Sequence, residues 1–298
     1  MGSPTSMVDA RAAGATLPLF EHFVVCGLSG HGLQTVQGEP GFLGTDVNYK
    51  PSFLDRLPHS DNPKRQPPPQ LPTCCLPAGV NIILKEDIAG AVLNPRMYAV
   101  VLTEGDGTKV YASCLAYYDE LPAELRARHE QLCGARALKA LCLLSHQPYL
   151  ACSERVLREL CNLAFVTGSP VPVVDVISHL LAVPCPSSAG SQARPILPSS
   201  RAVCFSVGSE RLVACPPLPV GPPAGELSLR PLAELLSPHN MAALFVAVLL
   251  ERRVLLRSRQ YRLLTLVAES VVRLLHPFKF QHVYIPVMPY SLVEYLEV

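Results

Sequence analysis

The sequence predicts an α/β protein built from two modules. The first is an antiparallel sheet covered by helices, and the second is a smaller, incomplete α/β unit with a parallel βαβ arrangement. Three observations support this prediction: β-forming runs flank a glycine-rich turn near residue 105, a strand–helix–strand pattern spans residues 253–288, and a proline- and serine-rich stretch separates the two regions. The expected organisation is a flexible leader, a first module, a linker and a second module, at residues 1–18, 19–184, 185–200 and 201–298.

The strands of the first module are predicted from their β-forming residues. Residues 20–28 (FEHFVVCGL) predict an opening strand, and the Gly-, Pro-, Asn- and Asp-rich residues 29–72 predict a long loop. Residues 97–103 and 108–118 surround two glycines and an aspartate, which supply the positive φ of a tight turn, so they predict an antiparallel hairpin. We expect residues 80–85 to pair beside this hairpin.

The helices of the first module follow the hairpin. Residues 122–133 begin with proline and carry charges at helical spacing, which predicts a helix, and residues 137–145 predict a buried strand. Two further helices are expected, one with Ser153 as its N-cap and one opened by Pro172. This order of elements predicts an antiparallel sheet with helices packed on it.

The second module is predicted to alternate between helices and strands. Two short strands are expected first, at residues 202–207 and 211–214. A long helix (238–250) and an apolar strand (253–258) follow, and then a second long helix (261–275) and a last apolar strand (282–288). Two strands that are joined by a crossover helix run parallel. A parallel sheet needs both faces covered, and two helices cannot do this, so the unit is expected to be incomplete.

Composition excludes some classes of function. The 25 basic and 24 acidic residues give a net charge of +1, so the basic surface that a nucleic-acid-binding protein needs is missing. The longest apolar run, residues 241–250, is half the roughly 20 residues that a membrane-spanning helix needs. The first six residues (MGSPTS) match the pattern for N-myristoylation at Gly2, although so loose a pattern also matches by chance and Met7 is an alternative start.

The eleven cysteines show no metal-binding spacing. There is no C-x-x-C pair, and most of the cysteines lie in apolar runs, so we expect reduced thiols in the core of a cytosolic protein. Cys142 and His146 are four residues apart, but no second pair accompanies them, and a closed zinc site needs four ligands. No cofactor or metal is therefore predicted.

Motifs of covalent catalysis also fail. In residues 27–33 (GLSGHGL), the nucleophile elbow would require glycine in place of His31, and the dinucleotide fingerprint would require glycine in place of Thr35. A turn after the first strand is the better interpretation. No small-molecule substrate is expected.

Two polar groups near the C-terminal end remain open to two interpretations. Glu251-Arg252-Arg253 follows a predicted helix, and these residues either form a solvated turn or contact a partner or the other module. Gln281, His282 and Tyr284 are either buried hydrogen-bonding residues that fix a turn or part of a recognition surface at the mouth of the sheet.

The same two segments carry a resemblance to the DENN domain. In that family a helix ends in L-L-E-x-R-V-L, and a later segment reads P-F-x-W-x-H-x-Y-I-P-x-L-P. The matching positions are Leu249, Leu250, Glu251, Arg253, Val254, Leu255, Pro277, Phe278, His282, Tyr284, Ile285, Pro286 and Pro289. FEHFVVCGL, CLPAGV and the predicted hairpin resemble upstream blocks, so the resemblance covers residues 20–298. Phe280 stands where tryptophan is usual, and another aromatic ring is expected to fill that space.

The resemblance implies a longin-like upstream module, a central DENN module and guanine-nucleotide exchange on a Rab-family small GTPase. Such a protein binds the switch regions and favours the conformation that releases GDP, so it needs no acid, base or nucleophile. The alternative is a non-catalytic DENN-like trafficking adaptor or an inactive truncated form, because the family's chain continues beyond the point at which this sequence ends. A hydrolase or metal enzyme is disfavoured by the failed motifs.

The resemblance also suggests a partner-binding surface and a location. We expect Glu251, Arg252, Gln281 and Tyr284 to contact the GTPase. The protein is expected in the cytoplasm, with peripheral recruitment to vesicle or endosomal membranes.

Overall fold

The computed structural model describes residues 18–59, 66–85, 95–105, 107–165, 172–185, 203–208, 210–214, 229–278 and 280–297. The predicted leader and linker lie almost entirely outside these residues, and so does the proposed lipidation site at Gly2.

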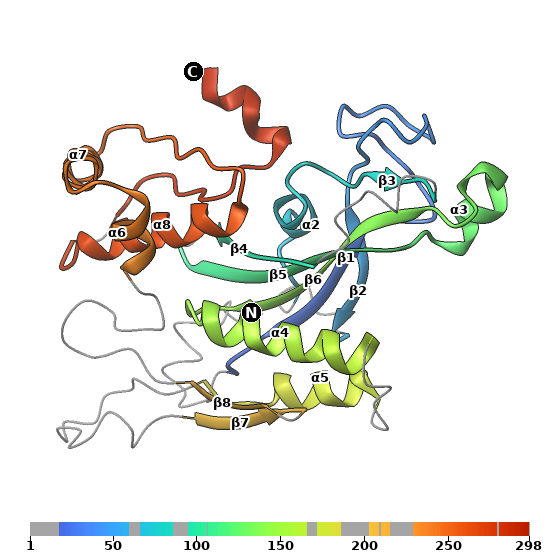
Figure 1. Cartoon of the computed structure of the whole chain (residues 1–298), viewed down its shortest axis with the longest axis horizontal. Coiled ribbons are helices and arrows are strands. Elements are labelled where there is room, and N and C mark those ends of the chain that lie inside the picture. Colours follow the sequence, from blue (N-terminus) through green and yellow to red (C-terminus); the bar gives the residue numbers. More distant parts are fainter. Residues whose placement is uncertain are drawn as a thin grey trace, which may run out of the picture.

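An antiparallel sheet forms the centre of the protein (Figure 1). Its strand order is β2-β1-β6-β5-β4, with β3 also paired to β6. The strands are β1 (His22–Gly27), β2 (Ser52–Leu57), β3 (Ile82–Ile83), β4 (Arg96–Thr103), β5 (Lys109–Glu120) and β6 (Arg136–Ser145). The predicted opening strand, hairpin and buried strand are therefore confirmed, whereas β3 pairs with β6 instead of with the hairpin.

Helices cover both faces of this sheet. On one face lies the short helix α2 (Leu71–Cys75), and on the other lie α4 (Leu150–Phe165) and α5 (Val173–Leu181). The strand residues alternate between these two cores, as the period of a strand requires. A separate hairpin of β7 (Val203–Val207) and β8 (Glu210–Ala214) contacts α4.

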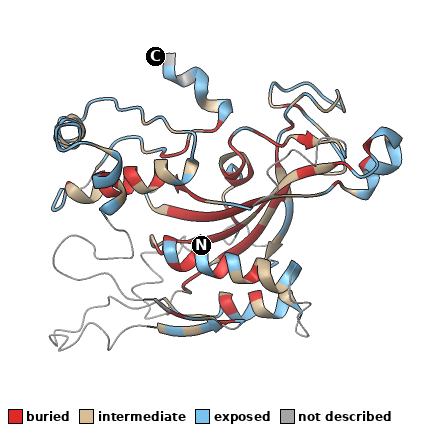
Figure 2. Ribbon diagram, viewed as in Figure 1, coloured by how far each residue is buried: buried red, intermediate tan, exposed pale blue. Residues whose placement is uncertain are grey.

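The remaining helices lie at the β4 edge of the sheet. They are α6 (Arg230–Leu235), α7 (Pro238–Leu249) and α8 (Tyr261–Leu274), and α8 packs against β4. Buried residues follow the sheet and the inner faces of α4 and α8, whereas none of the residues of α7 is buried (Figure 2). Short helical turns at α3 (Ala123–Arg128), η2 (Glu130–Leu132) and η4 (Tyr290–Glu297) complete the described elements.

The predicted parallel βαβ unit was wrong. The structure describes all residues of 253–258 and 282–288, and neither segment forms a strand. Leu255 and Val283 are 68% and 84% exposed, whereas Val287 is 4% exposed and packs into the core on the α2 face without pairing to a strand. An apolar run becomes a strand only where a neighbouring strand takes up its backbone N–H and C=O groups. Every ladder of the described sheets is antiparallel.

Smaller predictions also need correction. The long loop expected at residues 29–72 contains β2, an edge strand whose charged residues Asp55 and Arg56 obscured its β pattern. Ser153 is not an N-cap, because α4 already begins at Leu150. The Ser153 hydroxyl instead donates to the Tyr149 carbonyl oxygen, 2.6 Å away. The helix expected at residues 122–133 is divided into α3 and η2.

Candidate functional site

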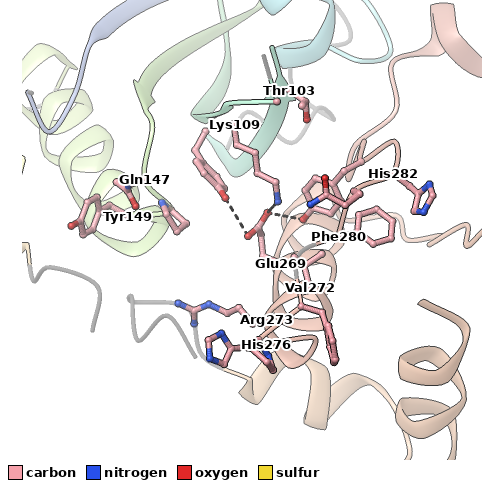
Figure 3. A pocket seen from close by; sticks show the side chains of 17 residues that line it. Thr103, Lys109, Gln147, Tyr149, Glu269, Val272, Arg273, His276, Phe280 and His282 are labelled. Carbon is pink, nitrogen blue, oxygen red and sulfur yellow. Dashed lines mark hydrogen bonds and ion pairs between the residues drawn. The ribbon is translucent and has the colours of Figure 1, made fainter. Parts of the chain in front are cut away.

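A pocket of about 630 Å³ lies between the β4–β5 hairpin, the end of α8 and the segment that follows α8 (Figure 3). Residues from four parts of the chain line it. They are Thr103, Gly107, Lys109 and Tyr111 of the hairpin, Gln147, Pro148 and Tyr149 before α4, Glu269, Val272, Arg273 and His276 around the end of α8, and Pro277, Phe278, Phe280, Gln281, His282 and Tyr284 beyond it. The volume lies in the range of small-molecule and peptide-anchoring pockets.

Glu269 is the central charged group of the pocket. Only 4% of the residue is exposed, and its carboxylate accepts hydrogen bonds from the hydroxyls of Tyr284 at 2.7 Å and Tyr111 at 3.4 Å. The ammonium group of Lys109 lies 3.7 Å from the same carboxylate and 4.0 Å from the centre of the Tyr284 ring. A buried carboxylate is tolerable only when it is paired and hydrogen-bonded in this way.

Local structure explains why these side chains meet. Lys109 and Tyr111 are two residues apart on β5, so they point to the same face of the strand. Glu269 lies on the buried face of α8, and Arg273 follows one turn later. In Figure 3, Lys109 and Glu269 face each other, while Arg273 and His276 lie on the other side of Glu269.

The electrostatics of the pocket keep both tyrosines protonated. Burial raises the pKa of Tyr284 and Tyr111, and the neighbouring Glu269 charge raises it further. Burial also lowers the pKa of Arg273. At neutral pH the two hydroxyls are therefore hydrogen-bond donors, with no role as bases or nucleophiles. The arrangement holds two segments together and orients what binds beside them.

The rim of the pocket is tied to the end of α7. Glu251 adopts a positive φ of 57° directly after the helix, and its carboxylate lies 2.9 Å from Nε2 of His282. The ring of Phe280 makes edge-to-face contacts with His282 and Tyr284, at centroid distances of 5.7 and 6.3 Å. Phe280 therefore places an aromatic ring at the position where tryptophan is usual in the resembled family.

The structure brings three of the four predicted partner-binding residues together. Gln281 and Tyr284 line the pocket, Glu251 joins the rim through His282, and Arg252 is exposed on the turn beside Glu251. Tyr284 forms a hydrogen bond, as one interpretation of this group required, and it also lines the pocket.

Sequence reasoning missed Glu269, Lys109 and Tyr111. A single acidic residue within the apolar stretch TLVAESVV was the available signal, since a charge on the buried face of a helix usually has a partner. Nothing in the sequence indicated the partner, because Tyr111 and Glu269 are 158 positions apart.

Two other sequence features have structural roles. Cys142 is completely buried in β6, and His146 follows the end of the same strand, where its Nε2 lies 2.8 Å from the Glu21 carboxylate. Residues 28–33 form an irregular connection after β1. Within the described ranges, no helix combines the length and the apolar character required to cross a bilayer.

Comparison with known proteins places these features in a family. Residues 136–298, more than half of the chain, match the DENN (AEX-3) domain, and residues 51–117 match the uDENN domain. The chain is 39% identical over 283 residues to the DENN domain and WD repeat-containing protein SCD1 of Arabidopsis thaliana. This similarity covers 94% of the chain but only 23% of SCD1. The pocket and its rim lie within the matched regions, and the chain therefore belongs to the DENN domain family.

Proposed function

We propose that this chain takes part in guanine-nucleotide exchange on a Rab-family small GTPase. Membership of the DENN family, whose characterised activity is of this kind, is the observation that carries the proposal. Because the chain spans about a quarter of its relative SCD1, the activity of any longer protein is part of the proposal as well.

The site supports a mechanism based on binding. Glu269 joins the β4–β5 hairpin to the segment after α8, so the pocket wall is held in one arrangement before a partner arrives. A surface that is complementary to the GDP-releasing conformation of the switch regions stabilises that conformation by its differential affinity, and GDP dissociates faster. No bond to the protein forms or breaks in this process.

We assign the contact surface to the rim. Glu251, Arg252 and Gln281 are all exposed, and the contact between Glu251 and His282 brings their two segments together. They present an acidic group, a basic group and an amide to a partner. Tyr284 supports this surface from beneath, since its hydroxyl is held by Glu269. We further propose that the sheet with its helices is the longin-like module of residues 19–184, that residues 201–298 form the central DENN module, and that the protein acts in the cytoplasm at vesicle or endosomal membranes.

Release of a fluorescent GDP analogue from a panel of Rab GTPases tests this function. We expect the protein to accelerate release from at least one Rab, and the variant Arg252→Glu to slow that release tenfold or more. The matched control is Arg128→Glu, which reverses an exposed charge on α3, at the opposite end of the sheet from α7. No acceleration for any Rab would reject the exchange function.

The same experiment distinguishes the alternative. A non-catalytic adaptor would bind a Rab stably, in a pull-down sensitive to Arg252→Glu, without changing the rate of GDP release. Exposed apolar side chains at Leu249 and Leu250, next to the rim, give that alternative a physical basis because they provide area for stable association.

A further inference from the structure

Four cysteines from four different elements meet in the core beneath α2. They are Cys26 of β1, Cys75 of α2, Cys114 of β5 and Cys142 of β6, and all four residues are 0% exposed. They lie in the same hydrophobic cluster, on the opposite face of the sheet from α4 and α5. This cluster is separate from the pocket and plays no part in the proposed exchange function.

Three of the four sulfur atoms are as close together as the ligands of one metal ion. The Sγ atoms of Cys75 and Cys114 lie 3.3 Å apart, and those of Cys114 and Cys142 lie 3.6 Å apart. The Sγ atoms of Cys75, Cys114 and Cys142 all lie within 4.8 Å of one another, and Cys26 is buried in the same hydrophobic cluster. With zinc–sulfur bonds of about 2.3 Å, the sulfurs of a tetrahedral site are about 3.8 Å apart.

The fold places these thiols by backbone register. Cys114 and Cys142 are direct cross-strand partners on β5 and β6. Cys26 pairs with Ala140, so it lies diagonally from Cys142 on the same face of the sheet. Cys75, at the end of α2, approaches this face from above, and its carbonyl oxygen accepts a hydrogen bond from the Tyr98 hydroxyl. Three of the thiols thus belong to strands of the sheet, and the fourth belongs to the helix that covers it.

Simple core packing explains this arrangement less well. Cysteine packs as a small hydrophobic residue, but packing alone does not require thiols from four separate elements to gather in one part of the core. The irregular spacing in the sequence hid the cluster, because its four members come from separate elements.

We propose that Cys26, Cys75, Cys114 and Cys142 form a structural zinc site. Loading replaces four thiol protons: one Zn²⁺ and four Cys–SH groups give a zinc tetrathiolate with a net charge of −2 and four released H⁺. Since the four side chains are completely buried, the ion enters while the chain folds and then holds α2 on the sheet.

Metal analysis of the protein, produced in zinc-containing medium and freed of loosely bound ions, tests the proposal. We expect one zinc per chain, and refolding with Co²⁺ alone should give an intense thiolate-to-cobalt charge-transfer band together with the visible bands of tetrahedral cobalt. Zinc far below one per chain, or a cobalt spectrum without the thiolate band, would overturn the site.

Substitutions locate the ion. Cys114→Ala and Cys142→Ala should each reduce zinc from one per chain to near zero, whereas Cys133→Ala and Cys204→Ala, which change exposed cysteines, should leave it at one. Circular dichroism establishes whether each variant folds. A folded Cys114→Ala variant that retains one zinc contradicts the assignment, and if neither core variant folds, the cobalt spectrum of the unchanged protein decides.

Discussion

The hydroxyl of Tyr284 lies 2.7 Å from the carboxylate of Glu269, and this hydrogen bond joins the segment after α8 to the buried face of that helix. Tyr111 donates to the other carboxylate oxygen from β5, so one acidic side chain connects three parts of the chain. The wall of the pocket therefore depends on a single buried charge.

Removing that charge should destabilise the protein strongly. Glu269→Ala leaves the two tyrosine hydroxyls and Lys109 without their shared acceptor, and we expect a loss of about 3 kcal/mol in the free energy of unfolding. Tyr284→Phe removes one hydrogen bond and should cost about 1 kcal/mol. Urea unfolding measures both values, and the double variant should lose less than their sum because the residues are in contact.

The matched control is Tyr290→Phe, which removes the hydroxyl of an exposed tyrosine and should change stability by less than about 0.5 kcal/mol. Equal effects of Tyr284→Phe and Tyr290→Phe would show that the Glu269 contact contributes nothing.

The hydroxyl of Thr265 should be important for docking α8 on the sheet. This buried group donates to the Ala99 carbonyl oxygen on β4, so Thr265→Val leaves that oxygen without this donor at nearly unchanged volume. We expect a loss of about 1–2 kcal/mol in urea unfolding. Ser178→Ala, which removes an exposed hydroxyl on α5, is the control and should cost far less. Unchanged stability of Thr265→Val would refute the docking role.

The pair of His146 and Glu21 should make stability depend on pH. Burial opposes the charged form of His146, but the hydrogen bond to Glu21 outweighs it and raises the pKa above the usual 6.5. A folded-state pKa above the unfolded value contributes stability that is fully present below about pH 6.5 and is lost as pH rises through the folded pKa. Glu21→Gln should therefore destabilise the protein more at pH 6 than at pH 8.5, by roughly 0.5–1 kcal/mol.

The neighbouring His22 also makes the destabilisation by Glu21→Gln larger at acidic pH. Burial lowers its pKa and Glu21 partly offsets this effect, so loss of the Glu21 charge lowers the pKa further and adds to the cost at acidic pH. Chemical unfolding at the two pH values gives the difference, with Asp55→Asn on the exposed part of β2 as the control. A destabilisation that does not vary with pH would be inconsistent with a charged His146.

Phe280→Trp should be tolerated and informative. The ring lines the pocket and is partly exposed, so a larger aromatic ring fits with a change in stability below about 1 kcal/mol. Because the chain has no tryptophan, the variant carries a single fluorophore at the proposed contact surface. Its emission should shift when the exchanging GTPase binds, and an unchanged spectrum in a saturated complex would place the contact elsewhere.

Elements whose local pattern agrees with their tertiary surroundings were predictable from the sequence. The hairpin of β4 and β5 has its own turn, and β6 carries an unbroken apolar run at residues 140–144 because it is central in the sheet. The run at residues 282–288 is equally apolar, but no strand lies beside it, so the same local pattern gave the wrong structure. Strand pairing depends on residues far away in the sequence, and a single segment does not reveal it.

The candidate site was predictable to a similar degree. Gln281 and Tyr284 stood out because polar groups interrupt an apolar segment, and both line the pocket. Glu269 of α8 and its partner Lys109 of β5 are far apart in the sequence, and only the docking of α8 on β4 brings them together. The four core cysteines were not predicted to meet because they come from four elements that are far apart in the sequence.

Helix α7 has no buried residue, and Val246, Leu249 and Leu250 are about half exposed. These apolar side chains are therefore solvated along one side of the molecule. Sulfate or moderate warming strengthens the hydrophobic attraction between such surfaces. Association through this surface should increase light scattering under those conditions, well below the temperature at which the central sheet unfolds. The protein should be most soluble at low temperature and low salt concentration.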